Sequence, residues 1–372
     1  MVKCIGVLTS GGDAPGMNAA VRAVARTCLN KGIEVYGVKL GYKGLHDGEF
    51  IKFDRHSTRN IINIGGTMLK SARFPEFKDP EVRKEAIEKM KEVGMEALVV
   101  IGGDGSYNGA LKLTEMGINC IGIPGTIDND IHGTDETIGF HTALYNIIDA
   151  VNKLRDTSSS HHRCFVIEVM GNQADNLAIN SAIACGSEIV ITDKTGFDET
   201  KVIEELKKCE EVYHKKHAII IVSENILDVE KLANRISKET GYSGRSIVLG
   251  HIQRGGSPVP KDRILASTMA EEAICLLKQE KSGLCVCVKN NRIVSKNIEE
   301  ALVEKNENHD WLYQLFFDLF FGLKLYRISN QYFCQHLYYV FFLSYFLQAF
   351  PFLMRLSLKY LLYRCNLHLD FL

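Results

Sequence analysis

The chain has 372 residues, which is enough for two domains, and its 44 Lys and Arg residues nearly balance 45 Asp and Glu residues. This balance excludes a globally basic surface for nucleic acid, and a composition of 46% hydrophobic and 24% charged residues excludes a disordered or collagen-like chain. The aromatic residues are unevenly distributed, since 20 of the 33 fall within residues 311–372, where only seven side chains carry a formal charge. The first 310 residues and the last 62 therefore need separate interpretations.

Short apolar runs in the first 250 residues predict buried strands at residues 4–8, 34–40, 96–103, 120–125, 164–171, 217–224 and 246–251. Because these runs are apolar throughout, they indicate parallel strands covered on both faces. Amphipathic stretches between them predict helices. In one of these, Asp79 is suited to cap the helix, Pro80 to begin it and Gly94 to end it. The alternation predicts a doubly wound α/β architecture.

The eleven cysteines are odd in number and irregularly spaced, and no C-x-x-C pair occurs, because Cys285 and Cys287 form only a C-x-C. This pattern argues against a zinc site or a redox dithiol. The N-terminal apolar run is interrupted at Gly6 and Thr9, which argues against a signal peptide. We therefore expect reduced thiols and a cytoplasmic protein.

Three glycine-rich or acidic segments follow predicted strands, where open α/β sheets bind their ligands. Residues 9–18 contain three glycines before a helix, which suits an anion or a simple tight turn, but no Gly-Lys-Ser/Thr follows as in a Walker A loop. In residues 101–106, Asp104 lies among glycines and either holds Mg²⁺ beside a nucleotide phosphate chain or caps a helix.

The third segment, residues 124–130, carries Asp128 and Asp130 two positions apart. Repulsion between two carboxylates raises the pKa of one of them, and such a pair can divide the roles of base and metal neighbour. An Asx-rich turn is the alternative. Loop arginines and the His251–Arg254 pair before Gly255 favour a phosphorylated ligand, although a lone arginine is usually a solvated surface residue.

The motifs TSGGDAPGMN, GGT…SARFPEF, VIGGDGS, PGTIDND, RDTSSSHHR, EVMG and LGHIQRGGSPVPKDR resemble, in order and at similar spacing, those of the bacterial ATP-dependent 6-phosphofructokinase family. The resemblance covers about residues 1–305. It implies a homotetramer that transfers the γ-phosphoryl group of ATP to the 1-hydroxyl of fructose 6-phosphate, the committing step of glycolysis. It also implies a larger ATP-binding domain (1–138 with 251–305), a smaller fructose 6-phosphate domain (139–250) and an active site in the cleft between them.

The resemblance also assigns roles to individual residues. The catalytic group would be Asp128, the proton acceptor, with Arg73, Thr126 and Asp130. ATP would be held by Gly12, Arg73, Phe74, Gly103, Asp104, Gly105 and Ser106, with Asp104 positioning Mg²⁺. The sugar phosphate would meet Thr126, Ile127, Asp128, Arg163, Met170, Gly171, Asn172, Glu224, Arg245, His251 and Arg254, with Arg163 and Arg245 supplied by a neighbouring subunit.

A second site is implied by Arg22 and Arg26, four residues apart on one helical face, for which a solvated basic face is the alternative. By resemblance they bind an effector nucleotide, with ADP activating and phosphoenolpyruvate inhibiting. The other members would be Arg55, Arg155, Gly186, Glu188, Tyr213, Lys215 and His217, of which Tyr213 replaces a family lysine.

Two departures from the family pattern affect these expectations. The family's M-G-R-x-x-G-x-L-A is here residues 170–178, with Asn172 in place of an active-site arginine and Asp175 in place of a glycine. A catalytically weakened, effector-binding subunit is therefore one alternative function, and a pyrophosphate-dependent enzyme is another. Gly105 and Gly125 favour the ATP interpretation. By resemblance, pyrophosphate-dependent relatives carry Asp and Lys at these two positions, and those side chains would fill the space that adenosine needs.

The aromatic tail, residues 306–372, is the other departure. Residues 328–354 carry no Lys, Arg, Asp or Glu and are long enough to span a bilayer, but Pro351 and several amide side chains weaken that case. A membrane anchor, a hydrophobic interaction segment and translated sequence unrelated to the fold are the three interpretations. We favour the last and expect no membrane attachment.

Overall fold

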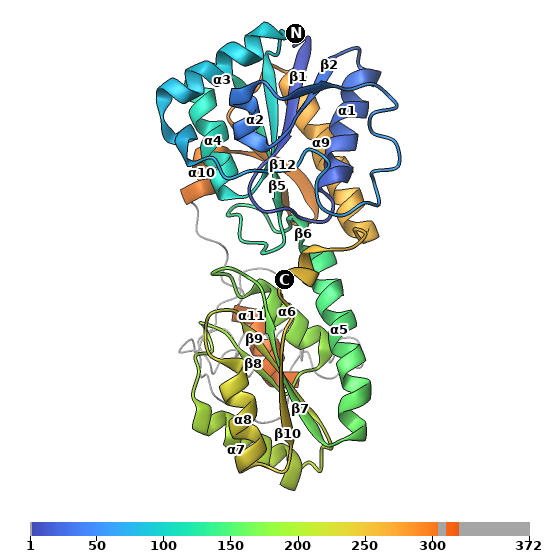
Figure 1. Cartoon of the computed structure of the whole chain (residues 1–372), viewed down its shortest axis with the longest axis vertical. Helices are drawn as coiled ribbons and strands as arrows, with labels where there is room; N and C mark the ends of the chain where they lie inside the picture. Colours follow the sequence, from blue (N-terminus) through green and yellow to red (C-terminus); the bar gives the residue numbers. More distant parts are fainter. Residues whose placement is uncertain (1, 304–309, 320–372) are drawn as a thin grey trace, which may run out of the picture. The chain divides into compact units, whose positions relative to one another are not determined.

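The computed structural model describes residues 2–303 and 310–319, and Figure 1 shows strands and helices alternating along the chain. The strands are β1 Cys4–Thr9, β2 Glu34–Val38, β3 Phe50–Lys52, β4 Ala97–Gly102, β5 Asn119–Thr126, β6 Ile138–Gly139, β7 Arg163–Val169, β8 Ile189–Ile191, β9 Ala218–Ser223, β10 Ser243–Val248, β11 Leu284–Lys289 and β12 Arg292–Asn297. The α-helices are α1 Met17–Asn30, α2 Gly41–Asp47, α3 Pro80–Glu92, α4 Asp104–Glu115, α5 Phe140–Ser160, α6 Asn176–Cys185, α7 Glu199–Glu211, α8 Val229–Glu239, α9 Pro260–Lys278, α10 Ile298–Val303 and α11 Asp310–Leu319. Two 3₁₀ turns, η1 Pro75–Lys78 and η2 Gly250–Arg254, complete the described elements.

The first sheet has eight strands in the order β12-β11-β5-β4-β1-β2-β3, with β6 paired to the end of β5. Its central strands are parallel, and β3 and β12 pair antiparallel at the two edges. Side chains alternate between two cores: Val7 faces the core shared with α1 and α9, whereas its neighbour Leu8 faces the core shared with α2, α3, α4 and α10. Figure 1 shows these two groups of helices on opposite faces. Burial on both faces explains why the central strands β1, β4 and β5 are almost entirely apolar.

The second sheet has four strands in the order β10-β7-β9-β8, and every described pair in it is parallel. Helices α5 and α6 share a core with Ile167 of β7 and Ile219 of β9, and α8 packs on β7 and β10. One mainly parallel and one parallel sheet, both packed against helices, confirm the predicted α/β fold class.

The seven predicted strands all form, within a few residues of their predicted ends. Helix α3 begins as expected, because the Asp79 carboxylate accepts a hydrogen bond from the amide N–H of Glu81 at 2.9 Å. Gly94 follows the helix with a φ of +71°, a conformation that glycine adopts at little cost. Strands β3, β6, β8, β11 and β12 were not predicted. Four of them are short or lie at a sheet edge where the apolar pattern is weak, whereas β11 is an apolar strand inside the sheet that the sequence analysis missed.

Helix α11 extends the described fold beyond residue 305, where the sequence suggested that the tail begins. Leu312, Tyr313 and Phe316 are buried, and α11 packs against α6. Their spacing places all three on one face of the helix, which gives this face an apolar partner. The segment 328–354 lies outside the described residues. Among the residues that the structure describes, none of the helices has the length and apolar character needed to cross a membrane.

Candidate active site

Three loops of the first sheet lie side by side, because they follow the adjacent strands β5, β4 and β1. The loop after β1 is joined to β4 by a hydrogen bond from the Ser10 amide to the Ile101 carbonyl oxygen at 3.0 Å. The Ser71 hydroxyl donates to the Gly11 carbonyl oxygen at 2.7 Å, which holds the segment carrying Arg73 beside this loop. The expectation that these motifs converge therefore holds for the first sheet.

The loop after β4 leads directly into α4, with Gly103 as the residue before the helix and Asp104 in its first turn. One oxygen of Asp104 is buried and has no hydrogen-bond partner within the described chain. Burial, and then the charge of Asp130, raises the pKa of the Asp104 carboxyl. Gly105 leaves open space, since a Cβ atom there would have no neighbour within 4 Å. An unpartnered carboxylate at a helix N-terminus beside open space suits a cation bound to a phosphate chain.

Phe74 and Gly125, two other residues predicted to shape the nucleotide site, have different surroundings. The Phe74 ring lies 5.5 Å from the His46 ring and 6.3 Å from the Phe77 ring. At Gly125 a Cβ atom would come within 3.1 Å of both Met17 and Ile101, so close packing as well as ligand space requires glycine here. The open space that the sequence suggested at both glycines is thus evident at Gly105 and restricted at Gly125.

The loop after β5 holds the acidic pair. Asp128 is 8% exposed, and burial, followed by the charge of Asp130, raises the pKa of its carboxyl to about 6, while Arg254 opposes the shift. The Thr126 hydroxyl lies 3.4 Å from one Asp128 oxygen and accepts a hydrogen bond from the Asp128 amide at 3.2 Å. Burial also raises the pKa of Asp130, against hydrogen bonds from Asn172 and Thr126. A carboxyl with a pKa near 6 can accept a proton at neutral pH.

Residues of the second sheet support this acidic loop. The Asn176 amide donates to the backbone carbonyl oxygens of Asp128 at 3.2 Å and Asn129 at 2.9 Å. Glu224, after β9, accepts hydrogen bonds from the amides of Gly171 at 3.0 Å and Asn172 at 2.7 Å. Asn172 has a φ of +57°, a left-handed conformation that asparagine tolerates better than most residues. The predicted Glu224, Gly171 and Asn172 are therefore brought together.

Sequence reasoning missed Asn176 and also Gln253. Gln253 is fully buried, and its side-chain oxygen accepts a hydrogen bond from the Met170 amide at 3.2 Å, which joins η2 to the loop after β7. Its position between the predicted His251 and Arg254 is the signal that could have identified it. For Asn176 the signal is a polar residue at a junction between a strand and a helix.

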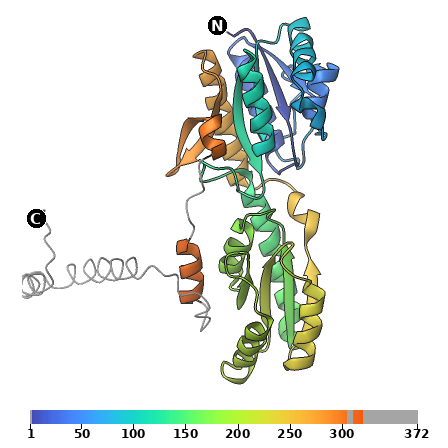
Figure 2. The same cartoon turned by 90° about the vertical axis from the view of Figure 1, so that its left-hand side faces the viewer.

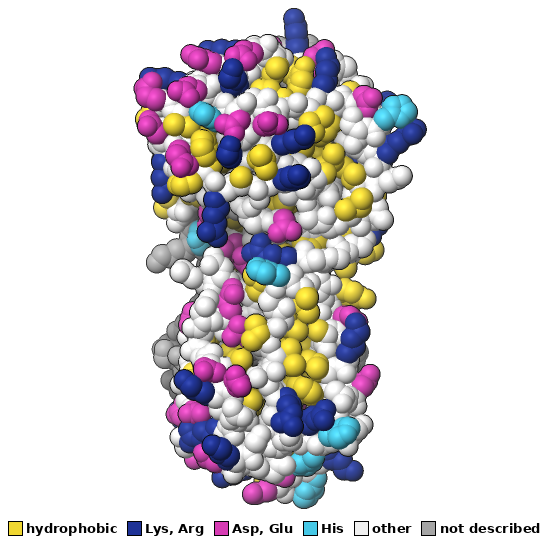
Figure 3. All heavy atoms as spheres, viewed as in Figure 1, with side chains coloured by type: hydrophobic (Ala, Val, Ile, Leu, Met, Phe, Trp, Pro, Cys, Tyr) yellow, Lys and Arg dark blue, Asp and Glu magenta, His cyan; other side chains and the backbone are white. Residues whose placement is uncertain are grey.

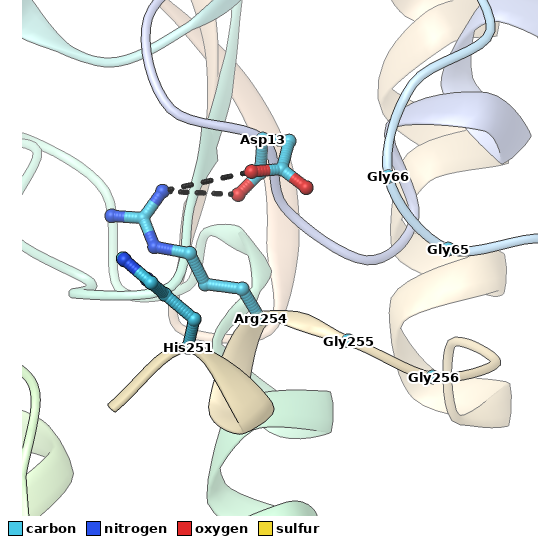
Figure 4. A pocket seen from close by; sticks show the side chains of 7 residues that line it. All are labelled: Asp13, Gly65, Gly66, His251, Arg254, Gly255 and Gly256. Carbon is cyan, nitrogen blue, oxygen red and sulfur yellow. Dashed lines mark hydrogen bonds and ion pairs between the residues drawn. The ribbon is translucent and has the colours of Figure 1, made fainter. Parts of the chain in front are cut away.

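A cavity of about 600 Å³ lies between the first loop and η2, lined by Asp13, Gly65, Gly66, His251, Arg254, Gly255 and Gly256. Figure 4 shows His251 and Arg254 extending from η2 toward Asp13. The Arg254 guanidinium donates to the Asp13 carbonyl oxygen at 3.3 Å and lies 3.9 Å from its carboxylate. It also lies against Gly12, where any side chain would collide with it. The Arg254 guanidinium, the donor nitrogens of His251 and the surrounding glycines make this cavity suited to an anionic ligand.

Arg163 and Arg245 do not join this site within the chain. Arg163 is the first residue of β7 and Arg245 the third of the six residues of β10, whereas Met170 and Glu224 follow the carboxyl ends of β7 and β9. Arg163 donates to the Thr157 hydroxyl at 3.2 Å, and Arg245 donates to the Gly244 carbonyl oxygen at 2.8 Å. Within a single chain, the two arginines therefore lie away from the carboxyl ends of the strands, where Met170 and Glu224 are found.

The residues predicted for the effector site fall into two groups. Arg22 and Arg26 lie on α1, and burial, followed by the charge of Arg26, lowers the pKa of Arg22. Arg55 also lies near α1, because it donates to Asn30 at 2.5 Å. The second group lies around the second sheet and comprises Arg155, Gly186, Glu188, Lys215 and His217.

Contacts join the members of this second group. Arg155 donates to the carbonyl oxygen of Cys185, the residue before Gly186. Glu188 accepts from Lys215 at 2.9 Å, and burial lowers the pKa of His217 against the charge of Glu188. Tyr213 lies two residues before Lys215, and 40% of it is exposed.

The residues of the loops fit Mg²⁺. Within residues 2–303 and 310–319, no group of three or more His, Cys, Asp or Glu side chains could hold a metal by themselves. Mg²⁺ commonly binds one or two carboxylates and completes its shell with water and substrate phosphates. The unpartnered oxygen of Asp104 fits such a site.

A model of the phosphofructokinase family matches residues 4–277. The chain belongs to this family. The resemblance inferred from the motifs is thereby confirmed. Among curated phosphofructokinases, the ATP-dependent 6-phosphofructokinase of Edwardsiella ictaluri (strain 93-146) is 53% identical over 314 residues, covering 84% of this chain and 98% of the relative. The enzyme of the same name from Vibrio campbellii (strain ATCC BAA-1116) is 54% identical over 321 residues, covering 86% and 100%.

Solved phosphofructokinase structures share the fold. The chain matches phosphofructokinase from Saccharomyces cerevisiae with a TM-score of 0.76 and 32% identity, covering 84% of this chain and 50% of the yeast chain. It matches the T-state enzyme of Pichia pastoris with a TM-score of 0.74 and 34% identity, covering 81% and 35%. It therefore spans half or less of these yeast chains. A pyrophosphate-dependent phosphofructokinase from Marinobacter aquaeolei, at 21% identity, a TM-score of 0.75 and coverage of 83% and 86%, shows likeness of fold alone.

Proposed function

We propose that the chain is an ATP-dependent 6-phosphofructokinase that phosphorylates the 1-hydroxyl of fructose 6-phosphate, as the family resemblance implies. The observation that carries this proposal is the buried Asp128, whose pKa of about 6 suits a base, in the loop after the strand adjacent to the one that leads to Asp104, which has one buried, unpartnered oxygen. Phosphoryl transfer depends mainly on positioning and on neutralising charge, and these loops supply both.

In the proposed reaction the nucleotide phosphates lie along Gly12 and residues 103–106, with Asp104 holding Mg²⁺, which would neutralise phosphate charge. Arg73 and Phe74 complete the nucleotide site, and the backbone N–H groups at the start of α4 favour the anionic phosphates. The open space at Gly105 leaves room for the rest of the nucleotide.

Asp128 would accept the proton of the sugar 1-hydroxyl while the oxygen of that hydroxyl forms a bond to the γ-phosphorus of ATP. The bond between that phosphorus and the bridging oxygen breaks, and ADP leaves with the bonding electrons. The Thr126 hydroxyl would help to keep the Asp128 carboxylate in place, whereas the like charge of Asp130 raises its basicity. Asn172 and Arg73 would donate to the developing negative charge.

The sugar phosphate would lie toward Met170, Gly171, Glu224, His251 and Arg254. Since Arg163 and Arg245 lie away from Met170 and Glu224 within one chain, we propose that they serve the site of another copy in the homotetramer that the family resemblance implies. We also propose that residues 1–138 with 251–305 form the ATP-binding domain and 139–250 the sugar-phosphate domain of a cytoplasmic, glycolytic enzyme.

Regulation by ADP and phosphoenolpyruvate would use the two groups of effector-site residues, one near α1 and one around the second sheet. Arg22 and Arg26 form a cluster of like charge, and the Nε of Arg26 is buried without a partner, as expected where an anion is to bind. Glu188, Lys215 and His217 would complete the effector site from the second sheet.

A weakened effector-binding subunit is the second candidate, and Asn172 is the observation that favours it, because its amide carries no charge. Steady-state assays of the purified chain alone, with fructose 6-phosphate and either ATP or pyrophosphate, separate the candidates. We expect turnover with ATP and Mg²⁺. Turnover with pyrophosphate alone would indicate the other donor class, and ADP binding without turnover would indicate the regulatory subunit.

A further inference from the structure

Asp175, which replaces a family glycine, is a centre of hydrogen bonds at the start of α6. One of its oxygens accepts from the Tyr313 hydroxyl of α11 at 2.9 Å and lies 3.4 Å from the Lys194 amide. The other accepts from the Ser223 hydroxyl at 3.3 Å. The acidic side chain therefore joins the loop after β7 to the end of β9 and to α11.

Helix α11 holds the Tyr313 hydroxyl firmly in this position. Tyr313 is 3% exposed, and its hydroxyl also makes a hydrogen bond of 3.0 Å with Thr192. The Lys194 ammonium lies 4.7 Å from the centre of the Tyr313 ring and pairs with Asp310 at the first residue of α11. Figures 1 and 2 show α11 against the second sheet and its helices. A group held by its ring and by two hydrogen bonds has little freedom to move.

From Asp175 two short paths lead to the candidate active site. The next residue, Asn176, holds the backbone of Asp128 and Asn129. On the other side, Ser223 precedes Glu224, which holds the amides of Gly171 and Asn172. Hydrogen bonds and neighbouring residues therefore link the Tyr313 hydroxyl to the supports of Asp128 and of the loop that carries Gly171 and Asn172.

We propose that Tyr313 is a positioning residue for phosphoryl transfer, acting through Asp175 on the loops that carry Asp128 and Asn172. This inference rests on the proposed function. It makes α11, within the segment whose composition departs from the rest of the chain, a part of the catalytic framework.

The test compares Tyr313→Phe with the matched control Thr192→Val in the full chain. Tyr313→Phe keeps the buried ring and its contact with Lys194 but loses the bond to Asp175. Thr192→Val removes the other partner of the same hydroxyl and keeps that bond. We expect kcat to fall about tenfold in Tyr313→Phe with KM for ATP unchanged, which is the effect of one hydrogen bond to a charged group, and to stay near wild type in Thr192→Val.

A double-mutant cycle with Asp175→Ala adds a second measurement. If Tyr313 acts through Asp175, the double variant should be no slower than Asp175→Ala alone. Amide hydrogen exchange of residues 126–130 and 170–176 should also become faster in Tyr313→Phe and not in Thr192→Val. An unchanged kcat in Tyr313→Phe would overturn the inference. So would equal losses of kcat in Tyr313→Phe and Thr192→Val, or additive losses of Tyr313→Phe and Asp175→Ala in the cycle. A wild type without turnover would instead contradict the proposed function, and hydrogen exchange would still decide the role of Tyr313.

Discussion

Replacing Asp128 with asparagine should stabilise the chain while it abolishes most of the activity. Asn keeps the shape of the side chain and its contact with Thr126, but it cannot ionise or accept the proton of the hydroxyl. We expect kcat to fall by about 10²-fold or more with little change in KM, because general-base catalysis contributes about 10²–10⁴-fold.

The stability change follows from the pKa. Burial, and then the charge of Asp130, raises the pKa of Asp128 from 3.8 to about 6, so the folded chain resists ionisation of this carboxyl. At about 1.4 kcal/mol per pKa unit, the ionised form costs the fold about 3 kcal/mol. This cost is absent below about pH 4, where the carboxyl is protonated in both folded and unfolded states, grows as the pH rises, and is complete above about pH 6.

Urea unfolding of the ligand-free wild type and of Asp128→Asn, from about pH 4 to about pH 8, measures this difference. The variant should match the wild type at the acidic end and exceed its unfolding free energy by up to about 3 kcal/mol at the alkaline end. Asp79→Asn, at an exposed helix cap, is a control for a general effect of removing a carboxylate. The fold disfavours the ionised form of Asp128 and thereby makes this carboxylate a better base. A variant that is no more stable than the wild type at any pH would refute this claim.

Three further predictions concern the site and the tail. Asn172→Arg should raise kcat about tenfold or more because a charged donor is stronger than a neutral one, with part of the gain lost to the left-handed φ of +57° at this position; an equal or lower kcat would mean that another residue already fills the role. Asp104→Asn should raise the Mg²⁺ concentration that gives half-maximal rate at saturating ATP, and an unchanged Mg²⁺ dependence would exclude Asp104 as a metal neighbour. Deletion of residues 320–372 should leave a folded, more soluble and active chain, and loss of folding in this shorter deletion would show that the segment after 319 is structural. Deletion from residue 310 should instead lower thermal stability, because it exposes the core beneath Leu312 and Phe316.

The sequence was sufficient to predict features that depend on local pattern. Strands such as Ala97–Gly102 were evident because burial on both faces demands a continuous apolar run, and the cap at Asp79 was evident because its partner is two residues away. Asp104, Asp128 and Asp130 could be identified because acidic residues among glycines at strand ends have few structural uses.

Features that depend on distant contacts could not be predicted. Asn176 supports Asp128 across 48 residues, and Tyr313 reaches Asp175 across 138. A side chain in such a contact has no periodicity that marks its partner. The same reason explains α11, whose aromatic residues look unpartnered until α6 is placed against them.

The central claim is that this chain transfers the γ-phosphoryl group of ATP to the 1-hydroxyl of fructose 6-phosphate. Phosphorus NMR of the purified full chain with ATP, Mg²⁺ and fructose 6-phosphate tests it most directly, with Asp128→Asn as the matched control. The account predicts ADP and a second phosphate ester on the sugar at C1, formed in equal amounts, and a rate at least about 10²-fold lower in the variant. A sugar that stays singly phosphorylated with ATP, or becomes doubly phosphorylated only when pyrophosphate replaces ATP, would contradict it.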